Sequence, residues 1–262
     1  MQALSVPILL YVFAIAYGFP EPQIVGGTDA PIGMFPYQVS LRQYDRHFCG
    51  GSIISSRYVL TAAHCVEGIY DKSSVTIHAG TNVLSSKGES YGVQKIVSHS
   101  GYDSSLLIND VAIIRVNKEI EFNDLVRPIP LAAGNNTFEG SECTLSGWGR
   151  IKAGGPIPDK LQYITLLIES EAKCKRAHDN VESSHICTFT KFGEGACNGD
   201  SGSPLVINDL QVGIVSFGMP CGVGYPDVYS RVSSFTTWIK EQYTLLQKDE
   251  IAAQPEDIIF VP

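Results

Sequence analysis

Short apolar runs separated by turn-forming residues fill most of this chain. Clear examples of such runs are residues 38–42, 75–79, 111–116, 163–168, 212–217 and 228–232. Turns rich in glycine, asparagine and proline lie between them, at residues 80–82, 86–88, 134–136, 154–156 and 222–224. Many short strands joined by regular turns predict an all-β fold of the sandwich or barrel type.

The pattern changes near the C-terminus. The residues that would share one face of a helix are Phe235, Trp238, Ile239, Gln242 and Leu246. Their spacing predicts a helix whose first turn Ser234 is placed to cap. Residues 247–262 form an acidic tail with an apolar end at 258–261. The end could dock on the body of the protein, but we expect a frayed terminus.

The other terminus begins with an apolar run that ends at Ala16 and is too short to cross a bilayer comfortably. We expect residues 1–16 to be a signal peptide, although residues 1–3 carry no basic group, which leaves an anchor or a buried segment as the alternative. Residues 17–23 contain two prolines and little to bury. We therefore expect a secreted, extracellular protein whose folded part begins after residue 23.

Composition narrows the function classes. The 262 residues are 44% hydrophobic and 18% charged, as in ordinary globular proteins, and the net charge of -8 offers no basic surface for nucleic acid. We find no solenoid or propeller repeat and no second candidate membrane span. Seven cysteines in a secreted chain predict three disulfides and one residue left over, which spacing alone leaves open among 105 arrangements.

Three separate stretches carry side chains suited to nucleophilic catalysis. Ser201 lies in the run Gly199-Asp200-Ser201-Gly202, His64 follows an apolar run, and Asp110 directly precedes another. Each alone is also typical of a turn, a structural histidine or a cap. Together they supply a nucleophile, a base and an acid that orients the base, in the chain order His, Asp, Ser.

Five motifs carry a resemblance to a known family. They are Ile24-Val25-Gly26-Gly27, Thr61-Ala62-Ala63-His64-Cys65, Asn109-Asp110, Ser146-Gly147-Trp148-Gly149 and Gly199-Asp200-Ser201-Gly202. In sequence and spacing they resemble the chymotrypsin family of secreted serine proteases, and within it the digestive chymotrypsins of arthropods. The resemblance runs from residue 24 to about 246. It implies two six-stranded antiparallel Greek-key β-barrels, about 24–131 and 132–246, with a C-terminal helix and the active site between the barrels.

The same resemblance implies a role for each site residue. Ser201 would be the nucleophile, His64 its general base and Asp110 the residue that orients the imidazole. The backbone N–H groups of Gly199 and Ser201 would form the oxyanion hole. The implied activity is hydrolysis of peptide bonds through an acyl-enzyme.

The resemblance also implies a zymogen. Cleavage before Ile24 would free an ammonium group that pairs with Asp200 and orders the site. Most relatives carry Lys or Arg before this point, whereas this chain has Gln23. Our hypothesis is therefore an activating protease other than trypsin.

The resemblance places the specificity pocket at Gly195, Ser216, Gly218 and Asp227. Gly195 brings no charge to the pocket floor, so we expect a preference for Phe, Tyr, Leu or Met before the cut. Asp227 stands where many relatives have glycine, which resembles the broader crustacean collagenolytic enzymes. Acceptance of Arg or Lys is therefore the alternative.

By matched position the disulfides would join Cys49 with Cys65, Cys174 with Cys187 and Cys197 with Cys221. The usual partner of Cys143 is replaced by Ile207, so we expect a buried free thiol rather than an intermolecular bridge. No cofactor or metal is expected, since no cysteine or histidine spacing suggests zinc and Thr81 opens the loop that binds calcium in some relatives. The triplet at Asn135 is an N-glycosylation acceptor pattern whose occupancy the sequence leaves open.

The expected partners are polypeptide substrates, protein protease inhibitors and an activating protease, with no nucleic acid and no membrane, and we expect a monomer. Two rival hypotheses are a non-catalytic homologue and a processing protease of an immune, clotting or venom cascade. Retention of all three triad residues disfavours the first. Ser203, which replaces a glycine common in the family, has no explanation at the level of sequence.

Overall fold

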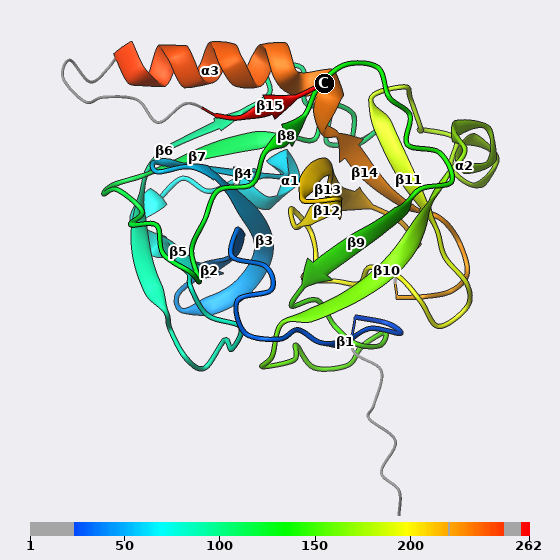
Figure 1. The fold of residues 1–262 in the computed structure, drawn as a ribbon, viewed down its shortest axis with the longest axis horizontal. Coiled ribbons are helices and arrows are strands. Elements are labelled where there is room, and N and C mark those ends of the chain that lie inside the picture. Colours follow the sequence, from blue (N-terminus) through cyan, green and yellow to red (C-terminus); the bar gives the residue numbers. More distant parts are fainter. Residues whose placement is uncertain (1–23, 220, 249–257) are drawn as a thin grey trace, which may run out of the picture.

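The computed structural model describes residues 24–219, 221–248 and 258–262. The expected signal peptide at 1–16 and propeptide at 17–23 lie outside these residues. Two β-barrels stand side by side in Figure 1, the first at left in blue to green and the second at right in green to orange. The all-β double-barrel architecture is therefore confirmed.

The first barrel closes in the strand order β2-β3-β4-β7-β6-β5. Its strands are β2 (Gln38–Gln43), β3 (Arg46–Ser55), β4 (Tyr58–Thr61), β5 (Val75–Ala79), β6 (Glu89–Ser98) and β7 (Ala112–Val116). Every residue of β4 and β7 is buried, so both strands are mainly apolar and lack the alternation of a strand with one solvated face, although Thr61 and Arg115 are buried polar residues within them. Branched side chains such as Leu60, Ile77 and Ile113 fill the interior without measurable exposure.

The second barrel follows the order β12-β9-β10-β11-β14-β13, and pairing of β12 with β13 closes it. Its strands are β9 (Glu142–Gly147), β10 (Gln162–Glu169), β11 (His185–Phe189), β12 (Pro204–Ile207), β13 (Leu210–Phe217) and β14 (Asp227–Arg231). Two short strands are added, with β8 (Leu131–Ala132) parallel to β13 and β1 (Thr28–Asp29) paired with β10. β10 alternates buried and exposed residues along its length, as expected for a sheet with one solvated face.

The predicted C-terminal helix is present as α3 (Thr236–Lys248). Ser234 does not cap it, because it lies inside the preceding 3-10 turn η2 (Val232–Phe235). α1 (Ala63–Val66), α2 (Glu171–Ala177) and the 3-10 turn η1 (Lys72–Ser74) were not anticipated, because one or two turns are too short to show helical periodicity. Among the described residues, no helix has both the length and the apolar character needed to cross a membrane.

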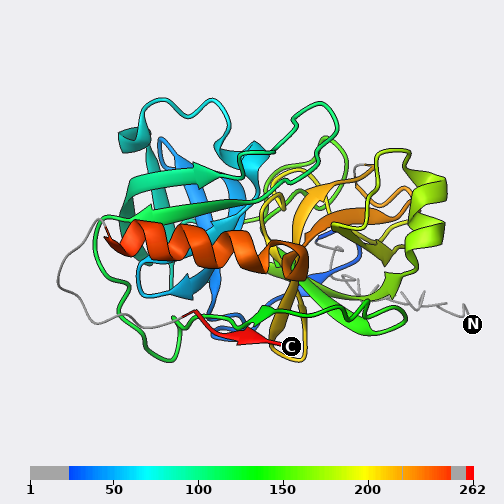
Figure 2. The same cartoon turned by 90° about the horizontal axis from the view of Figure 1, so that it is seen from above.

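The C-terminal tail differs from expectation. Residues 258–262 are docked, with β15 (Phe260–Val261) added parallel to β8 beside α3 (Figures 1 and 2). Leu131 N–H donates to Ile259 O at 2.8 Å, and the Ile258 side chain is only 7% exposed. The prediction of a frayed end is therefore wrong for these residues. The cause is the open edge of β8, which offers unpaired backbone groups to an added strand.

Candidate active site

The strand pair β4–β7 brings His64 and Asp110 together. The two strands pair antiparallel with Thr61 opposite Ala112, so α1, which follows β4, lies beside the residue that precedes β7. His64 Nδ1 lies 2.7 Å from Asp110 Oδ2, and His64 N–H donates to Asp110 Oδ1 at 2.9 Å. A carboxylate only accepts, so Nδ1 carries the proton and Nε2 is left as the basic nitrogen. The structure thus brings these two residues into direct contact.

The second barrel also supports this carboxylate. Asp110 is fully buried, and Ser216 Oγ donates to Asp110 Oδ2 at 2.6 Å. Ser230 Oγ donates to the backbone carbonyl of Asp110 at 2.7 Å. Ser216 was expected only as a pocket wall, and no local sequence signal could reveal the contact with Asp110, because it spans 106 positions.

Ser201 lies on the loop before β12, held against the first barrel. Gly50 N–H donates to Ser201 O at 2.8 Å, and Gly202 N–H donates to Val215 O at 2.9 Å. A Cβ atom on Gly202 would lie 2.2 Å from Thr61 Oγ1, so glycine is required where this loop meets the end of β4. Among the described residues Ser201 and His64 share no hydrogen bond. Such bonds often tighten only when substrate binds.

Two backbone donors flank Asp200 without a partner. Within the described residues neither Gly199 N–H nor Ser201 N–H makes a hydrogen bond, while Asp200 N–H donates to Cys197 O at 3.0 Å. Gly199 has φ of +103°, which favours glycine. Its carbonyl lies 3.0 Å from His47 Nε2. This geometry leaves two N–H groups free to bind an oxyanion.

His47 is a residue that the sequence analysis missed. Its Nδ1 lies 2.8 Å from Ser40 Oγ, so the ring is held between β2 and the loop of Ser201. Burial lowers the pKa of His47 to about 4, with the nearby Arg42 acting in the same direction against the Gly199 carbonyl. The imidazole is therefore neutral at ordinary pH. Its only sequence signal was a histidine at a strand start.

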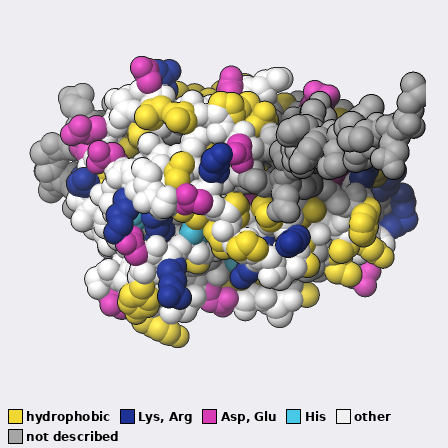
Figure 3. All heavy atoms as spheres, turned by 90° about the horizontal axis from the view of Figure 1, so that it is seen from below, with side chains coloured by type: hydrophobic (Ala, Val, Ile, Leu, Met, Phe, Trp, Pro, Cys, Tyr) yellow, Lys and Arg dark blue, Asp and Glu magenta, His cyan; other side chains and the backbone are white. Residues whose placement is uncertain are grey.

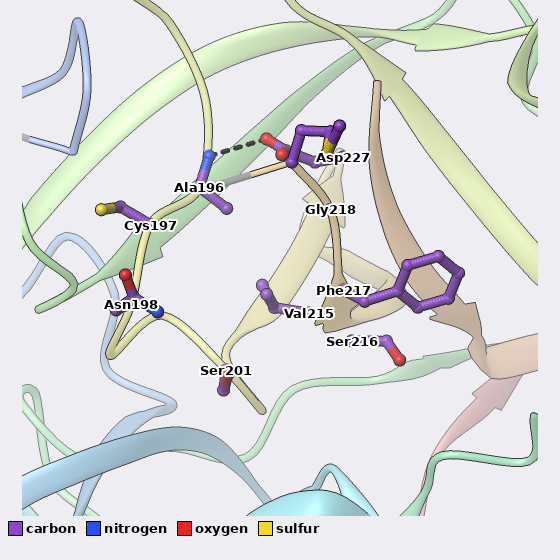
Figure 4. A pocket seen from close by; sticks show the side chains of 10 residues that line it. Ala196, Cys197, Asn198, Ser201, Val215, Ser216, Phe217, Gly218 and Asp227 are labelled. Carbon is purple, nitrogen blue, oxygen red and sulfur yellow. Dashed lines mark hydrogen bonds between the residues drawn. The ribbon is translucent and has the colours of Figure 1, made fainter. Parts of the chain in front are cut away.

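A pocket opens beside Ser201 (Figure 4). Its lining residues are Ala196, Cys197, Asn198, Ser201, Val215, Ser216, Phe217, Gly218, Met219 and Asp227. Three of the four residues predicted for the pocket line it. Gly195 does not, because the Asp227 carboxylate lies directly against it, 2.5 Å from where a Cβ of Gly195 would be. A side chain at 195 and the aspartate at 227 thus compete for one space.

The two carboxylate oxygens of Asp227 have different surroundings, since one accepts a backbone hydrogen bond and the other lies on the pocket side. Its Oδ2 accepts from Ala196 N–H at 2.7 Å, the bond dashed in Figure 4. Its Oδ1 faces Gly218, where a Cβ would lie 2.8 Å away, and accepts no hydrogen bond from the described residues. Burial raises the pKa of Asp227 to about 7, opposed by the Ala196 N–H and reinforced by Asp200. The carboxyl therefore titrates near neutral pH.

Asp200 occupies a cage of glycines. It is fully buried and accepts from Gly149 N–H at 2.7 Å and Cys197 N–H at 3.0 Å. Cβ atoms on Gly147 and Gly149 would lie 2.2 Å and 2.1 Å from its oxygens, which explains both glycines of that motif. Burial raises the pKa of Asp200 to about 6 against the two N–H donors.

The chain start described by the structure lies in the same region. The Ile24 side chain is fully buried, and Gly195 N–H donates to Val25 O at 3.0 Å. Ile24 has φ of +42°, a conformation that a β-branched residue rarely adopts. The segment from Ile24 to Val25 is thus seated in the second barrel beside the pocket.

The cysteines pair as the resemblance implied. The structure contains the disulfides Cys49–Cys65, Cys174–Cys187 and Cys197–Cys221. Cys143 is free and buried, and burial raises the pKa of its thiol to about 12. Among the described residues, the one group with metal-ligand atoms close together is Cys49, His64 and Cys65. Its two sulfurs are bonded to each other and are not free to bind a metal.

Paired barrels that bring a serine, a histidine and a buried aspartate to one junction define a serine endopeptidase of trypsin-like fold. A family model for trypsin matches residues 24–239. Chymotrypsin-2 of Vespa crabro is 53% identical over 218 residues, which cover 83% of this chain and 99% of that relative. Trypsin epsilon of Drosophila erecta is 36% identical over 252 residues, covering 90% and 97%. The chain belongs to the trypsin family of serine proteases.

Proposed function

We propose that this chain is a secreted chymotrypsin-like endopeptidase, made as a zymogen, that cuts after large apolar residues. The observation that carries the proposal is the shared junction of His64, Asp110 and Ser201 beside a pocket with no basic side chain and mostly apolar walls. The hornet relative that bears the name chymotrypsin supports the apolar preference.

In the proposed mechanism Ser201 attacks the substrate carbonyl. His64 Nε2 takes the hydroxyl proton and returns it to the leaving amine, and Asp110 stabilises the imidazolium through Nδ1–H. The free N–H groups of Gly199 and Ser201 bind the oxyanion of the tetrahedral intermediate. Water then hydrolyses the acyl-enzyme by the same steps.

Asp227 determines how strict the preference is. When its carboxyl is protonated, the pocket is neutral and lined by Val215, Phe217 and Met219, which suits Phe, Tyr, Leu or Met. When it is ionised, its free Oδ1 can pair with a basic side chain. Broad specificity that includes Arg and Lys is therefore the second candidate function, favoured by this one residue.

The proposed activation is a cut between Gln23 and Ile24. In support, the Ile24 side chain is already buried next to the pocket segment. Ile24 also has an unfavourable positive φ, and a cut before it would remove this constraint, because φ is defined by the preceding peptide bond. The new ammonium would pair with Asp200, whose burial disfavours its charge without a cation. Gln23 keeps the activator outside the usual trypsin specificity.

The test is a cleavage profile of the activated protein on a peptide library. The N-terminus is sequenced first, to establish that it begins at Ile24, and a serine-directed phosphonate reports the active fraction. Ser201→Ala serves as the matched control. Cleavage mainly after Phe, Tyr, Leu or Met supports the proposal. Cleavage mainly after Arg favours the second candidate, and no labelling overturns both.

A further inference from the structure

A polar hollow lies on the second barrel, away from the proposed active site. It measures about 320 Å³, within the range of about 300–1,000 Å³ typical of small-molecule sites. Its lining residues are Gly134, Asn135, Asn136, Thr137, Glu171, Ser183, Arg231, Ser233 and Ser234. One wall is therefore the acceptor triplet itself, on the connection from β8 to β9 that passes between the C-terminal end and α2 (Figure 1).

The chemistry of the hollow fits a neutral ligand rich in hydroxyl groups. The hydroxyls of Ser183, Ser233 and Ser234 make no hydrogen bond within the described residues, so they are free to donate and accept. The carboxylate of Glu171 would repel an anionic ligand, and the guanidinium of Arg231 would repel a cationic one. Among the residues that the structure describes, no large apolar side chain lines the hollow.

The walls are fixed before any ligand arrives. Arg231 Nε donates to Ser183 O at 3.1 Å, and its Nη2 donates to His185 O at 2.8 Å. Asn136 Oδ1 accepts from Phe138 N–H at 2.9 Å, which commits that amide to the loop. Asn135 is exposed and its amide has no partner among the described residues. Of the two neighbouring asparagines, only Asn135 begins an acceptor triplet, and its side chain is exposed and without a partner among the described residues.

We propose that Asn135 is N-glycosylated and that the first sugar residues of the glycan lie in this hollow, bonded to its serine hydroxyls. The inference rests on the proposed secretion, since the modifying enzyme works in the secretory pathway. Transfer forms a bond between Asn135 Nδ2 and C1 of the sugar. The bond from C1 to the diphosphate of a lipid-linked donor breaks, the amide loses one proton and the lipid diphosphate leaves.

The first test is the mass of the full chain secreted from insect cells, before and after treatment with peptide N-glycosidase. Enzymatic release converts Asn135 to Asp, which locates the glycan by peptide mapping. Asn135→Gln and Thr137→Ala should each remove the glycan, whereas the matched control Asn136→Asp keeps the triplet and the oxygen that binds Phe138 N–H. Secreted protein without a glycan at Asn135 overturns the proposal.

The second test asks whether the first sugar residues lie in the hollow. Hydrogen bonds to the hollow should slow release from the native protein by about tenfold relative to the denatured protein. Ser234→Phe, which fills the hollow from an exposed position, should restore fast release, while Thr237→Phe, also exposed but outside the lining, should not. Equal release rates for these two variants would overturn the placement of the sugar in the hollow. The inactive Ser201→Ala chain should give the same readouts. A failure of the glycan proposal can therefore be told apart from a failure of the proposed activity.

Discussion

The two barrels differ in what fills their interiors and in the groups that they contribute to the proposed site. The first is filled by branched apolar side chains, and the proposed base and its aspartate lie at one end of it, where β4 and β7 end and begin. The second has a smaller apolar cluster, two disulfides and the buried carboxyls of Asp200 and Asp227. The difference teaches that the first barrel holds a fixed geometry, while the second carries the buried carboxyls to which we assign the proposed activation and specificity.

The face in Figure 3 shows no such division. On it, acidic and basic side chains are interspersed among apolar ones, and neither sign forms a continuous patch on the described atoms in view. The contrast between the barrels concerns their interiors. It arises from burial of a few carboxyls rather than from the overall net charge of -8.

The largest expected effect is the loss of catalysis when either barrel loses its residue of the proposed triad. Ser201→Ala on the second barrel and His64→Ala on the first should each lower kcat about 10⁶-fold, with KM little changed, because the residues act as one unit. The double variant should be no worse than either single one. Additive losses in kcat, measured on a peptide ester or amide, would contradict the shared mechanism.

The apolar core of the first barrel offers the next contrast. Ile113→Ala removes a fully buried side chain and should lower the free energy of unfolding by about 2–5 kcal/mol. The matched control is Ile32→Ala, since Ile32 is 81% exposed and should change little. Denaturant titration of both variants checks this, and equal midpoints would show that the first barrel does not depend on its core.

The second barrel should depend more on its crosslinks. Replacing Cys174 and Cys187 by alanine opens a link of sequence separation 13, and should cost about 3 kcal/mol of stability. Cys143→Ala, which removes a buried thiol without a bridge, is the matched control and should cost much less. Thermal unfolding of the two variants decides the point. A control as destabilising as the double variant would place the stability in packing instead.

Asp227 should make specificity depend on pH. Its carboxyl is ionised above a pKa of about 7, so the ratio of kcat/KM on an Arg substrate to that on a Phe substrate should rise by up to about tenfold per pH unit between pH 6 and 8. Asp227→Asn should make this ratio flat. A ratio independent of pH in the unmodified enzyme would remove Asp227 from substrate selection.

The same group has a stability consequence of opposite sense to a salt-bridged aspartate. The folded carboxyl keeps its proton up to about pH 7, whereas an unfolded one loses it near the ordinary aspartate pKa of 3.8. The folded state therefore binds more protons in this window, and the free energy of unfolding falls as pH rises through it. Asp227→Asn should lessen that fall.

The smallest expected effect concerns the docked tail. Ile258→Asp places a charge on a side chain that is 7% exposed, and should cost about 1–2 kcal/mol, since much of the burial is offset by the entropy of ordering a terminus. Ile259→Asp, at a side chain 56% exposed, is the control. Limited digestion by a carboxypeptidase should remove the tail faster only from Ile258→Asp. Equal rates would mean that the buried Ile258 side chain does not hold the tail on β8.

Local pattern was enough for the elements that are long and regular. The strands around 75–79, 111–116 and 163–168 and the helix near residue 239 followed from periodicity. The pocket residues came from the family resemblance instead, and three of the four line the pocket. α1 and α2 were missed because a short helix has too few residues for a period to appear. The docked end of the chain was missed because the β8 edge with which it pairs lies far away in the sequence.

Ser203 is understood only in three dimensions. Its buried hydroxyl accepts from Gln38 Nε2 at 3.3 Å, and Gln38 Oε1 accepts from Ser146 Oγ at 2.8 Å. A serine that the sequence left unexplained thus joins a hydrogen-bond chain from the loop before β12 through β2 to β9, across both barrels. The glycine common at this position in the family has no hydroxyl to offer.

The spacing of apolar residues by itself predicted an all-β fold of sandwich or barrel type. The short motifs, through the resemblance that they carry to the chymotrypsin family, implied the double barrel, the protease family and the residues of the proposed site. The tertiary structure alone decided how each group is used. Ser216 supports Asp110, His47 holds the Gly199 carbonyl, and Asp227 fills the space that Gly195 leaves. These contacts join residues far apart in the chain, and hydrogen bonding and burial act on distance in space, which the order of residues does not contain.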